Sequence, residues 1–229
     1  LASGESPMKI LIANLGSTSF KYRLFDVSAE TDTSGDEREL ARGGVERIGS
    51  QESRVYASLD NEAAQVNQIE TIQPIPNHGV ALEAAITQLT AEGGPLSSIA
   101  DVAAIGFKAV HGGKAGGVVR VNDSVLDAME EMADVAPAHN PPYVKAMKQL
   151  AERFPNVPLI AAFETGFHST IPERNARYAV PTEWLEKHLV RRWGFHGASH
   201  RFIAERLTEI MEQRPLRAVQ CHLGGSSSI

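Results

Sequence analysis

The hydrophobic pattern at the start of the chain predicts two strands joined by a short polar turn. Residues 10–13 form an apolar run that is typical of a buried strand, and residues 14–19 interrupt it with small, hydrogen-bonding side chains. In residues 20–24, large apolar side chains alternate with Lys21 and Arg23, as expected of a strand with one buried face. The chain therefore begins with a strand, a turn and a returning strand.

The residues of this turn also suit an anion. Gly16 allows the backbone to bend sharply or to lie close to a ligand. Residues 17–19 offer three hydroxyl groups together with backbone N–H groups, and Lys21 adds a positive charge nearby. An ordinary β-hairpin with a Gly/Ser turn accounts for the same residues equally well, so both interpretations stay open at this point.

The next part of the chain continues the β-rich pattern. Strands are predicted at residues 54–59 and 66–72. Gly43-Gly44 and Asp60-Asn61 are expected to mark turns around them, which gives an antiparallel start.

Beyond this start, segments with helical spacing alternate with apolar runs. The runs predict strands at residues 102–110, 158–163 and 218–223. The helical pattern predicts a helix at 79–89, a second from a cap at Asp123 or Ser124 to Met132, and a third that begins at Asn140-Pro141-Pro142. It predicts two more, one from a cap at Thr182 to near Gly194 and one at 200–211. In the last of these, Ile203, Leu207 and Ile210 are expected to face inward. Such alternation indicates α/β layering.

The end of the chain repeats the form of its beginning. An apolar run at 218–223 is followed by a Gly/Ser turn at 224–228. We therefore expect residues 164–229 to begin a second copy of the opening architecture that is incomplete at Ile229.

Composition narrows the class of protein. The chain has 229 residues, 42% of them hydrophobic, and a net charge of −6, which argues against nucleic acid or an anionic membrane as the main partner. No apolar run reaches the length of a bilayer span, and no signal peptide is visible. The single Cys221 excludes an internal disulfide and favours a cytoplasmic location. Residues 1–7 are interpreted as a tag remnant or a disordered extension.

Two local patterns resemble known sites but fail on their spacing. His111-Gly-Gly-Lys114 is similar to the end of a Walker phosphate loop, yet the glycine required six positions before the lysine is Lys108. His196 and His200 are four apart, as in a helical zinc pair, but Gly197 stands where a metalloprotease needs its glutamate. Neither pattern is assigned a function on its own.

Six motifs in order resemble those of acetate kinases. The stretches that carry the resemblance are NLGSTSFKYRLFD, GFKAVHGG, APAHNPP, FETGFHSTIP, RRWGFHGASH and CHLGGSSSI. Their family counterparts include N-A/C-G-S-S-S-x-K, G-H-R-V-V-H-G-G, A-P-L-H-N-P and Y-G-F-H-G-T-S-H. The resemblance runs from Met8 to Ile229 and covers only the first part of the considerably longer family members.

This resemblance implies a fold and a reaction. The family belongs to the acetate and sugar kinase/Hsc70/actin superfamily, whose members have two duplicated actin-like (ribonuclease H-like) α/β domains around a cleft. Residues 8–163 would form the first domain, a mixed sheet with flanking helices, and residues 164–229 the incomplete start of the second. The implied reaction transfers the ATP γ-phosphoryl group to acetate and gives acetyl phosphate and ADP. It uses Mg²⁺ (or Mn²⁺), in a cytoplasmic enzyme that is a homodimer when full length.

The resemblance also implies roles for individual residues. The catalytic residues would be Asn14, Lys108, Glu164 and His196. Asn14 would also lie near the metal, and His196 would be the main transition-state stabiliser. The acceptor carboxylate would lie against Lys108, Val110, Ala138, His139 and Phe195. The phosphates of ATP would lie against Ser17, Ser19, Lys21, His222, Gly224 and Gly225.

Several positions depart from the family pattern. Lys108 replaces the substrate-binding arginine and Glu164 replaces the catalytic aspartate, so a longer carboxylate could compensate for a differently placed cation. Gly225 and Ser226 stand where the family has Asn and Gly, and Ala138 replaces a leucine of the acyl pocket. Two alternatives therefore stay open: a propionate or butyrate kinase, and a non-catalytic protein that binds an anion or an acyl phosphate. Without the adenosine-binding motifs, the chain as given is expected to be an inactive fragment.

Overall fold

The computed structural model describes residues 8–27, 37–60, 66–212, 214 and 217–229. The interpretation of residues 1–7 as an extension lies outside the described residues. Within the described ranges, no helix combines the length and the apolar character needed to cross a membrane.

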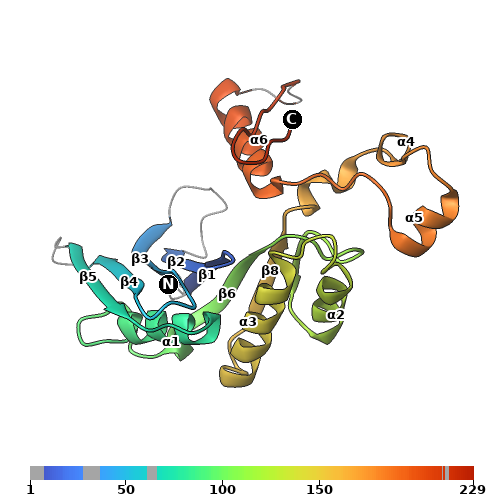
Figure 1. The fold of residues 1–229 in the computed structure, drawn as a ribbon. Helices are drawn as coiled ribbons and strands as arrows, with labels where there is room; N and C mark the ends of the chain where they lie inside the picture. Colours follow the sequence, from blue (N-terminus) through green and yellow to red (C-terminus); the bar gives the residue numbers. More distant parts are fainter. Residues whose placement is uncertain (1–7, 28–36, 61–65, 213, 215–216) are drawn as a thin grey trace.

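An eight-stranded mixed sheet forms the centre of the molecule (Figure 1). Its order is β5-β4-β3-β2-β1-β6-β8-β7. The strands from β1 to β5 pair antiparallel, whereas β1, β6 and β8 run parallel, and the short β7 closes the edge antiparallel. Their bounds are β1 Met8–Leu15, β2 Ser19–Val27, β3 Arg38–Glu46, β4 Ser53–Asp60, β5 Val66–Gln73, β6 Val102–Ala109, β7 Val118–Arg120 and β8 Leu159–Phe163.

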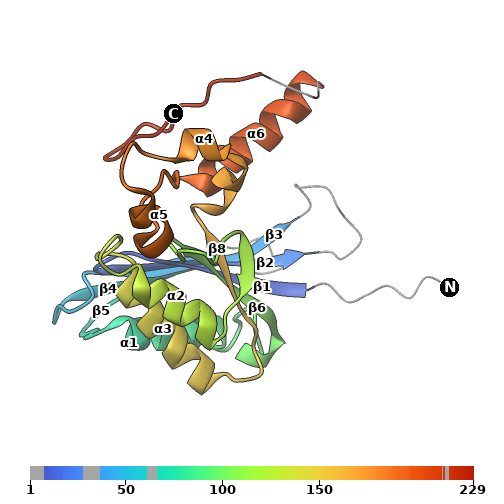
Figure 2. The same cartoon turned by 90° about the vertical axis from the view of Figure 1, so that its right-hand side faces the viewer.

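The helices lie on two sides of this sheet. Three of them cover one face, and the later helices lie beyond the other face (Figures 1 and 2). The covering helices are α1 His78–Leu89, α2 Asp123–Glu131 and α3 Asn140–Arg153. The later elements are η2 Gly166–Thr170, α4 Glu173–Ala176, α5 Thr182–His188 and α6 Gly197–Met211, and a short η1 Ile99–Asp101 precedes β6.

The alternation predicted for residues 20–24 is confirmed, whereas the run at residues 10–13 forms a strand that is buried on one face only, with Ile12 40% exposed. In β1, Leu11 and Ala13 are fully buried, and in β2 Tyr22 and Leu24 are buried while Lys21 is exposed. Residues on one face of a strand point to the same side, so this alternation builds a single buried face against the covering helices. The expected strands β4, β5, β6 and β8 and the expected helices α1 and α3 are present as well.

The prediction of a turn at Gly43-Gly44 is wrong, because both glycines lie inside β3. A Cβ atom on Gly43 would lie 2.6 Å from the hydroxyl of Tyr22, and one on Gly44 would lie 2.5 Å from the carbonyl oxygen of Phe20. The glycines therefore make room for tyrosine side chains and backbone carbonyl groups of neighbouring strands rather than for a change of direction. Gly in a strand often marks such a close approach.

Two expected helix starts shift. Asn122 caps α2 by accepting a hydrogen bond from the backbone N–H of Val125 at 3.0 Å, in place of Asp123 or Ser124. Thr182 is the first residue of α5 rather than its cap, and the helix ends at His188 because Leu189 adopts a left-handed conformation.

The last part of the chain departs most from expectation. Residues 218–223 form no strand within the described part, and only an isolated bridge joins His222 and Ser228. The expectation that Ile203 and Ile210 face inward is also wrong, since they are 38% and 64% exposed. Among the described residues, no strand lies beside residues 218–223 to pair with them, and the part of α6 that carries Ile203 and Ile210 stays exposed.

Candidate functional site

The turn between β1 and β2 is fixed by backbone and helix contacts. The N–H of Gly16 donates to the carbonyl oxygen of Ser19 at 2.8 Å. The Nε2–H of His78, at the start of α1, donates to the carbonyl oxygen of Gly16 at 2.8 Å. The side chain of Ser17 is exposed beside this turn. The turn therefore holds a defined shape with free hydroxyl groups, which an anion can use.

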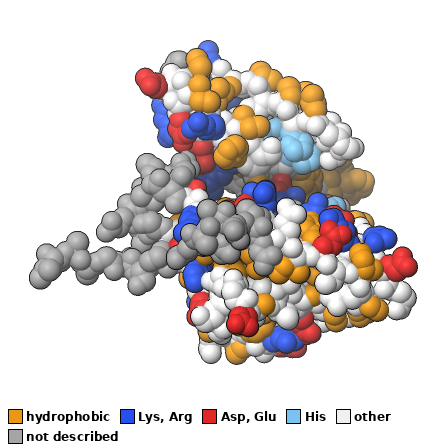
Figure 3. Space-filling view, turned by 90° about the vertical axis from the view of Figure 1, so that its left-hand side faces the viewer, with side chains coloured by type: hydrophobic (Ala, Val, Ile, Leu, Met, Phe, Trp, Pro, Cys, Tyr) orange, Lys and Arg blue, Asp and Glu red, His pale blue; other side chains and the backbone are white. Residues whose placement is uncertain are grey.

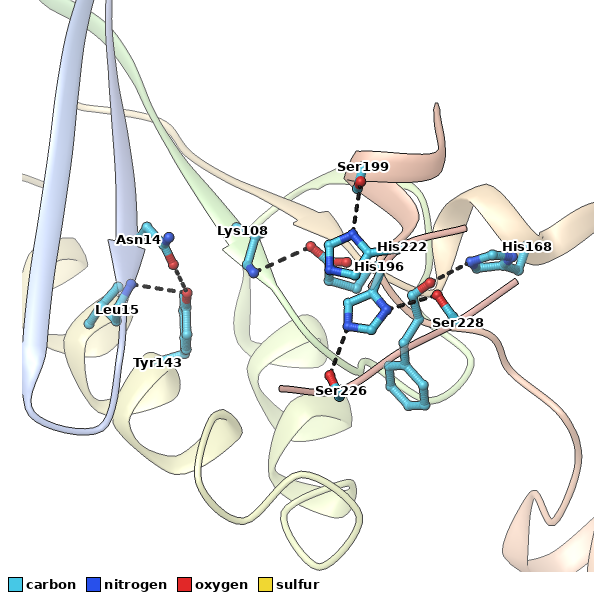
Figure 4. Close-up of polar contacts among 12 residues, drawn as sticks. Asn14, Leu15, Lys108, Tyr143, His168, His196, Ser199, His222, Ser226 and Ser228 are labelled. Carbon is cyan, nitrogen blue, oxygen red and sulfur yellow. Dashed lines mark hydrogen bonds and ion pairs between the residues drawn. The ribbon is translucent and has the colours of Figure 1, made fainter. Parts of the chain in front are cut away.

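Tyr143 ties this turn to α3 and was missed by the sequence reasoning. Its hydroxyl accepts from the N–H of Leu15 at 3.0 Å and donates to Oδ1 of Asn14 at 3.1 Å (Figure 4). Burial raises its pKa to about 12, so the hydroxyl keeps its proton and orients the amide of Asn14. Lys21 pairs with Asn14 across the two strands. The one signal in the sequence was an aromatic residue directly after Asn140-Pro141-Pro142.

Lys108 and Glu164 form an ion pair where two parallel strands end. Lys108 lies near the end of β6, and Glu164 follows β8 directly, with its N–H donating to the carbonyl oxygen of Ala109 at 2.9 Å. The carboxylate lies 3.5 Å from the ammonium group; its side chain is only 7% exposed, whereas that of Lys108 is 47% exposed. Ligand sites in α/β sheets commonly lie at this end of parallel strands.

His196 and His222 lie together on the other side of this ion pair (Figure 4). Their rings stack with centroids 4.0 Å apart. Burial lowers the pKa of His196, and the charges of His222, His200 and Lys108 lower it further, while Glu164 opposes them. His196 is therefore a neutral imidazole near neutral pH. The charges of Lys108 and Glu164 both act on its pKa.

The backbone around His196 is unusual. His196 adopts a left-handed conformation with φ of 56°, directly before α6 begins at Gly197. A Cβ atom on Gly197 would overlap the carbonyl oxygen of Glu164, and one on Gly194 would overlap the ring of His168. Gly197 thus permits the close approach of the α6 start to Glu164, and Gly194 permits the chain to pass close to His168. A non-glycine residue in this conformation is uncommon and is often found at functional sites.

Serine hydroxyl groups surround the two histidines. Ser226 and Ser228 lie 3.1 Å and 2.8 Å from the ring nitrogens of His196, and Ser199 lies 3.0 Å from Nδ1 of His222. Gly224 and Gly225 lie in the exposed turn between His222 and these serines.

The structure brings the expected site residues into two groups. One group is the β1–β2 turn with Asn14, Ser17, Ser19 and Lys21. The other contains Lys108, Glu164, His196 and His222 with the turn at Gly224 and Gly225.

The expected acyl pocket is only partly assembled. The rings of Phe195 and His111, next to Val110, have centroids 6.0 Å apart. Ala138 and His139 are exposed at the start of α3, and in the described part of the chain the His139 side chain makes no hydrogen bond.

His111 is a buried residue that the sequence reasoning had set aside. Its Nδ1 accepts from the N–H of Gly113 at 3.0 Å. Its ring packs edge to face with that of Trp193, and the two ring centroids are 4.8 Å apart. Asn140 donates to the carbonyl oxygen of His111 at 2.7 Å. This segment is thus a packed corner that carries Lys108 and Val110, which agrees with rejecting a Walker loop.

A large apolar groove lies beside Lys108. It has a volume of about 1110 Å³ and lies between the uncovered face of the sheet, at Ile12 and Ile160, and η2 with α6, at Phe167 and Phe202. Figure 3 shows a hollow between the upper and lower parts of the molecule, with basic side chains along its lower border and histidines on the upper part. Lys108 lies on the wall of the groove.

Comparisons with known proteins agree with this geometry. The fold is shared with solved acetate and propionate kinases, and a model of the Acetokinase family matches residues 9–229. The chain therefore belongs to the Acetokinase family. The expected actin-like α/β fold, a mixed sheet with flanking helices, is confirmed.

Individual relatives support the same conclusion. The chain is 40% identical over 226 residues to the acetate kinase of Carboxydothermus hydrogenoformans, which covers 97% of this chain and 54% of that protein. The solved propionate kinase from Francisella tularensis superposes with a TM-score of 0.81 at 27% identity, covering 96% of this chain and 53% of that one. The acetate kinase of Porphyromonas gingivalis gives 0.75 at 32% identity, covering 90% and 49%. The chain spans about half the length of the curated relatives it matches.

Proposed function

We propose that this chain is the N-terminal part of a carboxylate kinase that transfers the γ-phosphoryl group of ATP to acetate, reversibly giving acetyl phosphate and ADP. The observation that carries the proposal is the Lys108–Glu164 ion pair beside His196, whose pKa is lowered mainly by burial, and its stacking partner His222. These groups supply one positive charge and several hydrogen-bond donors at one place, which is what phosphoryl transfer between two anions requires.

The chemistry asks little of the protein beyond position and charge. A carboxylate is ionised near neutral pH, since such groups titrate at roughly 4, so no general base is needed. Lys108 would hold the acceptor carboxylate, and Glu164 would keep Lys108 in place. His196 and His222 would donate to oxygens of the transferring group. The hydroxyl groups of Ser17 and Ser19 would meet the phosphates of ATP, with Lys21 adding charge.

A divalent cation, Mg²⁺ or Mn²⁺, would be held mainly by the nucleotide. Within the described ranges, no three His, Cys, Asp or Glu side chains are arranged to hold a metal ion. Asn14 offers an amide oxygen that has one lone pair left after accepting from Tyr143, which suits a single contact to a metal or its water. Bound Mg²⁺ would neutralise phosphate charge, as usual in phosphoryl transfer.

We further infer the setting of the enzyme. Its domains would be residues 8–163 and a second actin-like domain that starts at residue 164. The enzyme would be a cytoplasmic homodimer when full length, without nucleic acid or membrane as partner. The exposed Cys221 fits a reducing compartment.

Propionate or butyrate as acceptor is the second candidate. Ala138 is smaller than the leucine of the acetate kinase pattern, and a solved propionate kinase superposes well on the chain. A protein that only binds an anion or an acyl phosphate is the third.

A hydroxamate assay for acyl phosphate separates these functions. The sample is an extended chain, in which residues 1–229 are followed by the C-terminal half of the Carboxydothermus hydrogenoformans acetate kinase. We expect hydroxamate that depends on ATP, Mg²⁺ and acetate, and a loss of about 10²-fold or more in Lys108→Met, the scale of removing one charged group from a transition state. Lys114→Met, an exposed lysine nearby, is the matched control. Binding of acetyl phosphate without turnover would contradict the kinase and favour the binding protein.

A further inference from the structure

A chain of hydrogen bonds leads from His196 away from the ion pair. Oγ of Ser228 lies 2.8 Å from Nδ1 of His196 and 2.7 Å from Nε2 of His200. Backbone hydrogen bonds of 2.9 Å and 3.0 Å between His222 and Ser228 hold this serine in place. A hydroxyl group has one proton, so Ser228 can donate to only one of the two rings and must accept from the other.

Gln220 decides the direction of these hydrogen bonds. Its Oε1 lies 3.3 Å from Nδ1 of His200, and an amide oxygen only accepts. With the amide in this orientation, a His200 ring that carries one proton holds it on Nδ1, and its Nε2 accepts from Ser228. His200 is only 4% exposed, so water offers little alternative partner.

The proton of His196 follows from this order. Because Ser228 donates to His200, its oxygen accepts from Nδ1–H of His196. Nε2 of His196 then carries no proton and accepts from the hydroxyl of Ser226 at 3.1 Å. We propose that Gln220, His200 and Ser228 act together as positioning residues that set which ring nitrogen of His196 carries its proton.

The direction of all these hydrogen bonds reverses if one group, the amide of Gln220, changes its orientation. If Gln220 turns its amide, its NH₂ group donates to Nδ1 of His200, and every proton along the line moves to the other side of its hydrogen bond. His196 then carries its proton on Nε2 and becomes a donor there without any change in charge. This consequence rests on the proposed function, since a donor at Nε2 is what a phosphoryl oxygen requires.

The charged and titratable groups around His196 do not determine which of its ring nitrogens carries the proton. His222 stacks on its ring, and Lys108 and Glu164 act on it through space. Each of them changes how readily the ring takes up a second proton. The hydrogen bonds of Ser226 and Ser228 are the ones that distinguish Nδ1 from Nε2.

Histidine tautomers can be read directly in the 229-residue chain. Long-range ¹H–¹⁵N correlation spectra of the labelled chain, without nucleotide or carboxylate, show which nitrogen of each neutral ring is protonated. We expect Nδ1–H for His196, although free histidine prefers Nε2–H. Ser228→Ala should return His196 to mainly Nε2–H, Ser228→Thr should keep Nδ1–H, and Ser227→Ala, its exposed neighbour, should change nothing.

A second pair of variants tests the far end. At a pH where His200 carries one proton, Gln220→Glu offers only acceptor oxygens and should keep Nδ1–H on His196, whereas Gln220→Met cannot accept and should release it. If Ser228→Ala also shifts the His222 signals, it has disturbed the backbone bridge, and the Gln220 pair decides. Nε2–H on His196 in the unsubstituted chain, or the same tautomer in Gln220→Met and Gln220→Glu, would overturn the proposal.

Activity separates this inference from the proposed function. In the extended chain, Gln220→Glu, which keeps the proton of His196 on Nδ1 and so withholds the donor at Nε2, should lower kcat by about tenfold, the scale of one neutral hydrogen bond, with little change in KM. Ser228→Ala, which frees Nε2–H, should not lower kcat in this way. An extended chain that makes no acyl phosphate, with the tautomers as expected, contradicts the kinase and leaves the positioning role supported. An extended chain that makes acyl phosphate as expected, but whose His196 carries its proton on Nε2, supports the kinase and contradicts the positioning role.

Discussion

Residues 8–163 and residues 164–229 are stabilised in different ways. Among the described residues, every buried hydrophobic side chain except that of Ala176 comes from the first region. The second region exposes large apolar side chains such as Phe202 and Ile210, yet it contributes Glu164, His196 and His222 to the site. Burial thus builds the scaffold of the first region, whereas the second region supplies part of the candidate site from a largely exposed segment, as is usual for elements that move or bind.

The uncovered face of the sheet explains the contrast. Parallel strands such as β1, β6 and β8 are normally buried on both faces. Here α1 and α3 lie on one face, while Ile12 on the other face is 40% exposed towards the apolar groove. Among the described residues, no helix of the second region packs extensively on the sheet, so this region gains little from the shared core.

The largest expected effect compares one core residue with one on α6. Leu24→Ala in the fully buried core should lower the free energy of unfolding by about 2–5 kcal/mol. Ile210→Ala, at a side chain that is 64% exposed, should change it by less than about 0.5 kcal/mol. Urea unfolding of the 229-residue chain measures both. Equal losses in the two variants would show that the second region shares the core.

The second prediction separates chemistry from stability. In the extended chain, His196→Ala should lower kcat by about 10²–10³-fold, the scale of losing one transition-state donor, with a smaller change in KM. Its melting temperature should stay close to that of the unsubstituted protein, because His196 packs in the weakly buried region. His188→Ala, at the exposed end of α5, is the control. An unchanged kcat would remove His196 from the mechanism.

The sequence was a good guide wherever a pattern is local. The alternation of residues 20–24 requires a strand with one buried face, and Asn140-Pro141-Pro142 requires a helix start, and both are present. Gly43-Gly44 was misread because the reason for these glycines is the bulk of Tyr22 and Tyr56 on neighbouring strands. Such contacts depend on strand pairing, which no local pattern contains.

The site divides in the same way. The family motifs indicated the residues themselves, and the pairing of Lys108 with Glu164 followed from two complementary departures. Tyr143, His200 and Ser228 were not foreseen, because their roles depend on distances between segments far apart in the chain. The interpretation of 218–223 as a strand failed because a strand needs a partner, and the described residues offer none beside it.

A smaller effect concerns the acceptor. In the extended chain, Ala138→Leu should lower kcat/KM for propionate and butyrate relative to acetate, because the leucine fills space that an added methylene would use. Discrimination by one methylene is typically about 1–3 kcal/mol. The ratios of kcat/KM for the three carboxylates measure it. Unchanged ratios would mean that Ala138, which is exposed here, does not set acceptor size.

The smallest expected effect concerns the pH dependence of the first region. Burial lowers the pKa of His111 below its ordinary value of 6.5. The unfolded chain therefore binds a proton that the folded chain resists, so this contribution to stability is complete above about pH 6.5 and is lost as the pH falls.

His111→Asn tests the pH effect, because it keeps an acceptor for the N–H of Gly113 but cannot titrate. Urea unfolding between neutral and mildly acidic pH should show a smaller loss of stability in this variant. His188→Asn should leave the pH dependence unchanged. The same slope in both variants would contradict the assignment to His111.

The most direct test of the account measures acyl phosphate made by two samples side by side. One is the 229-residue chain, with its length verified by intact mass, and the other is the extended chain. Both contain Lys108, Glu164, His196 and His222, but only the extended chain contains the half that relatives have in addition. We expect hydroxamate that depends on ATP and Mg²⁺ from the extended chain and none from the 229-residue chain. Turnover by the verified 229-residue chain, or none by a folded extended chain, would contradict the account.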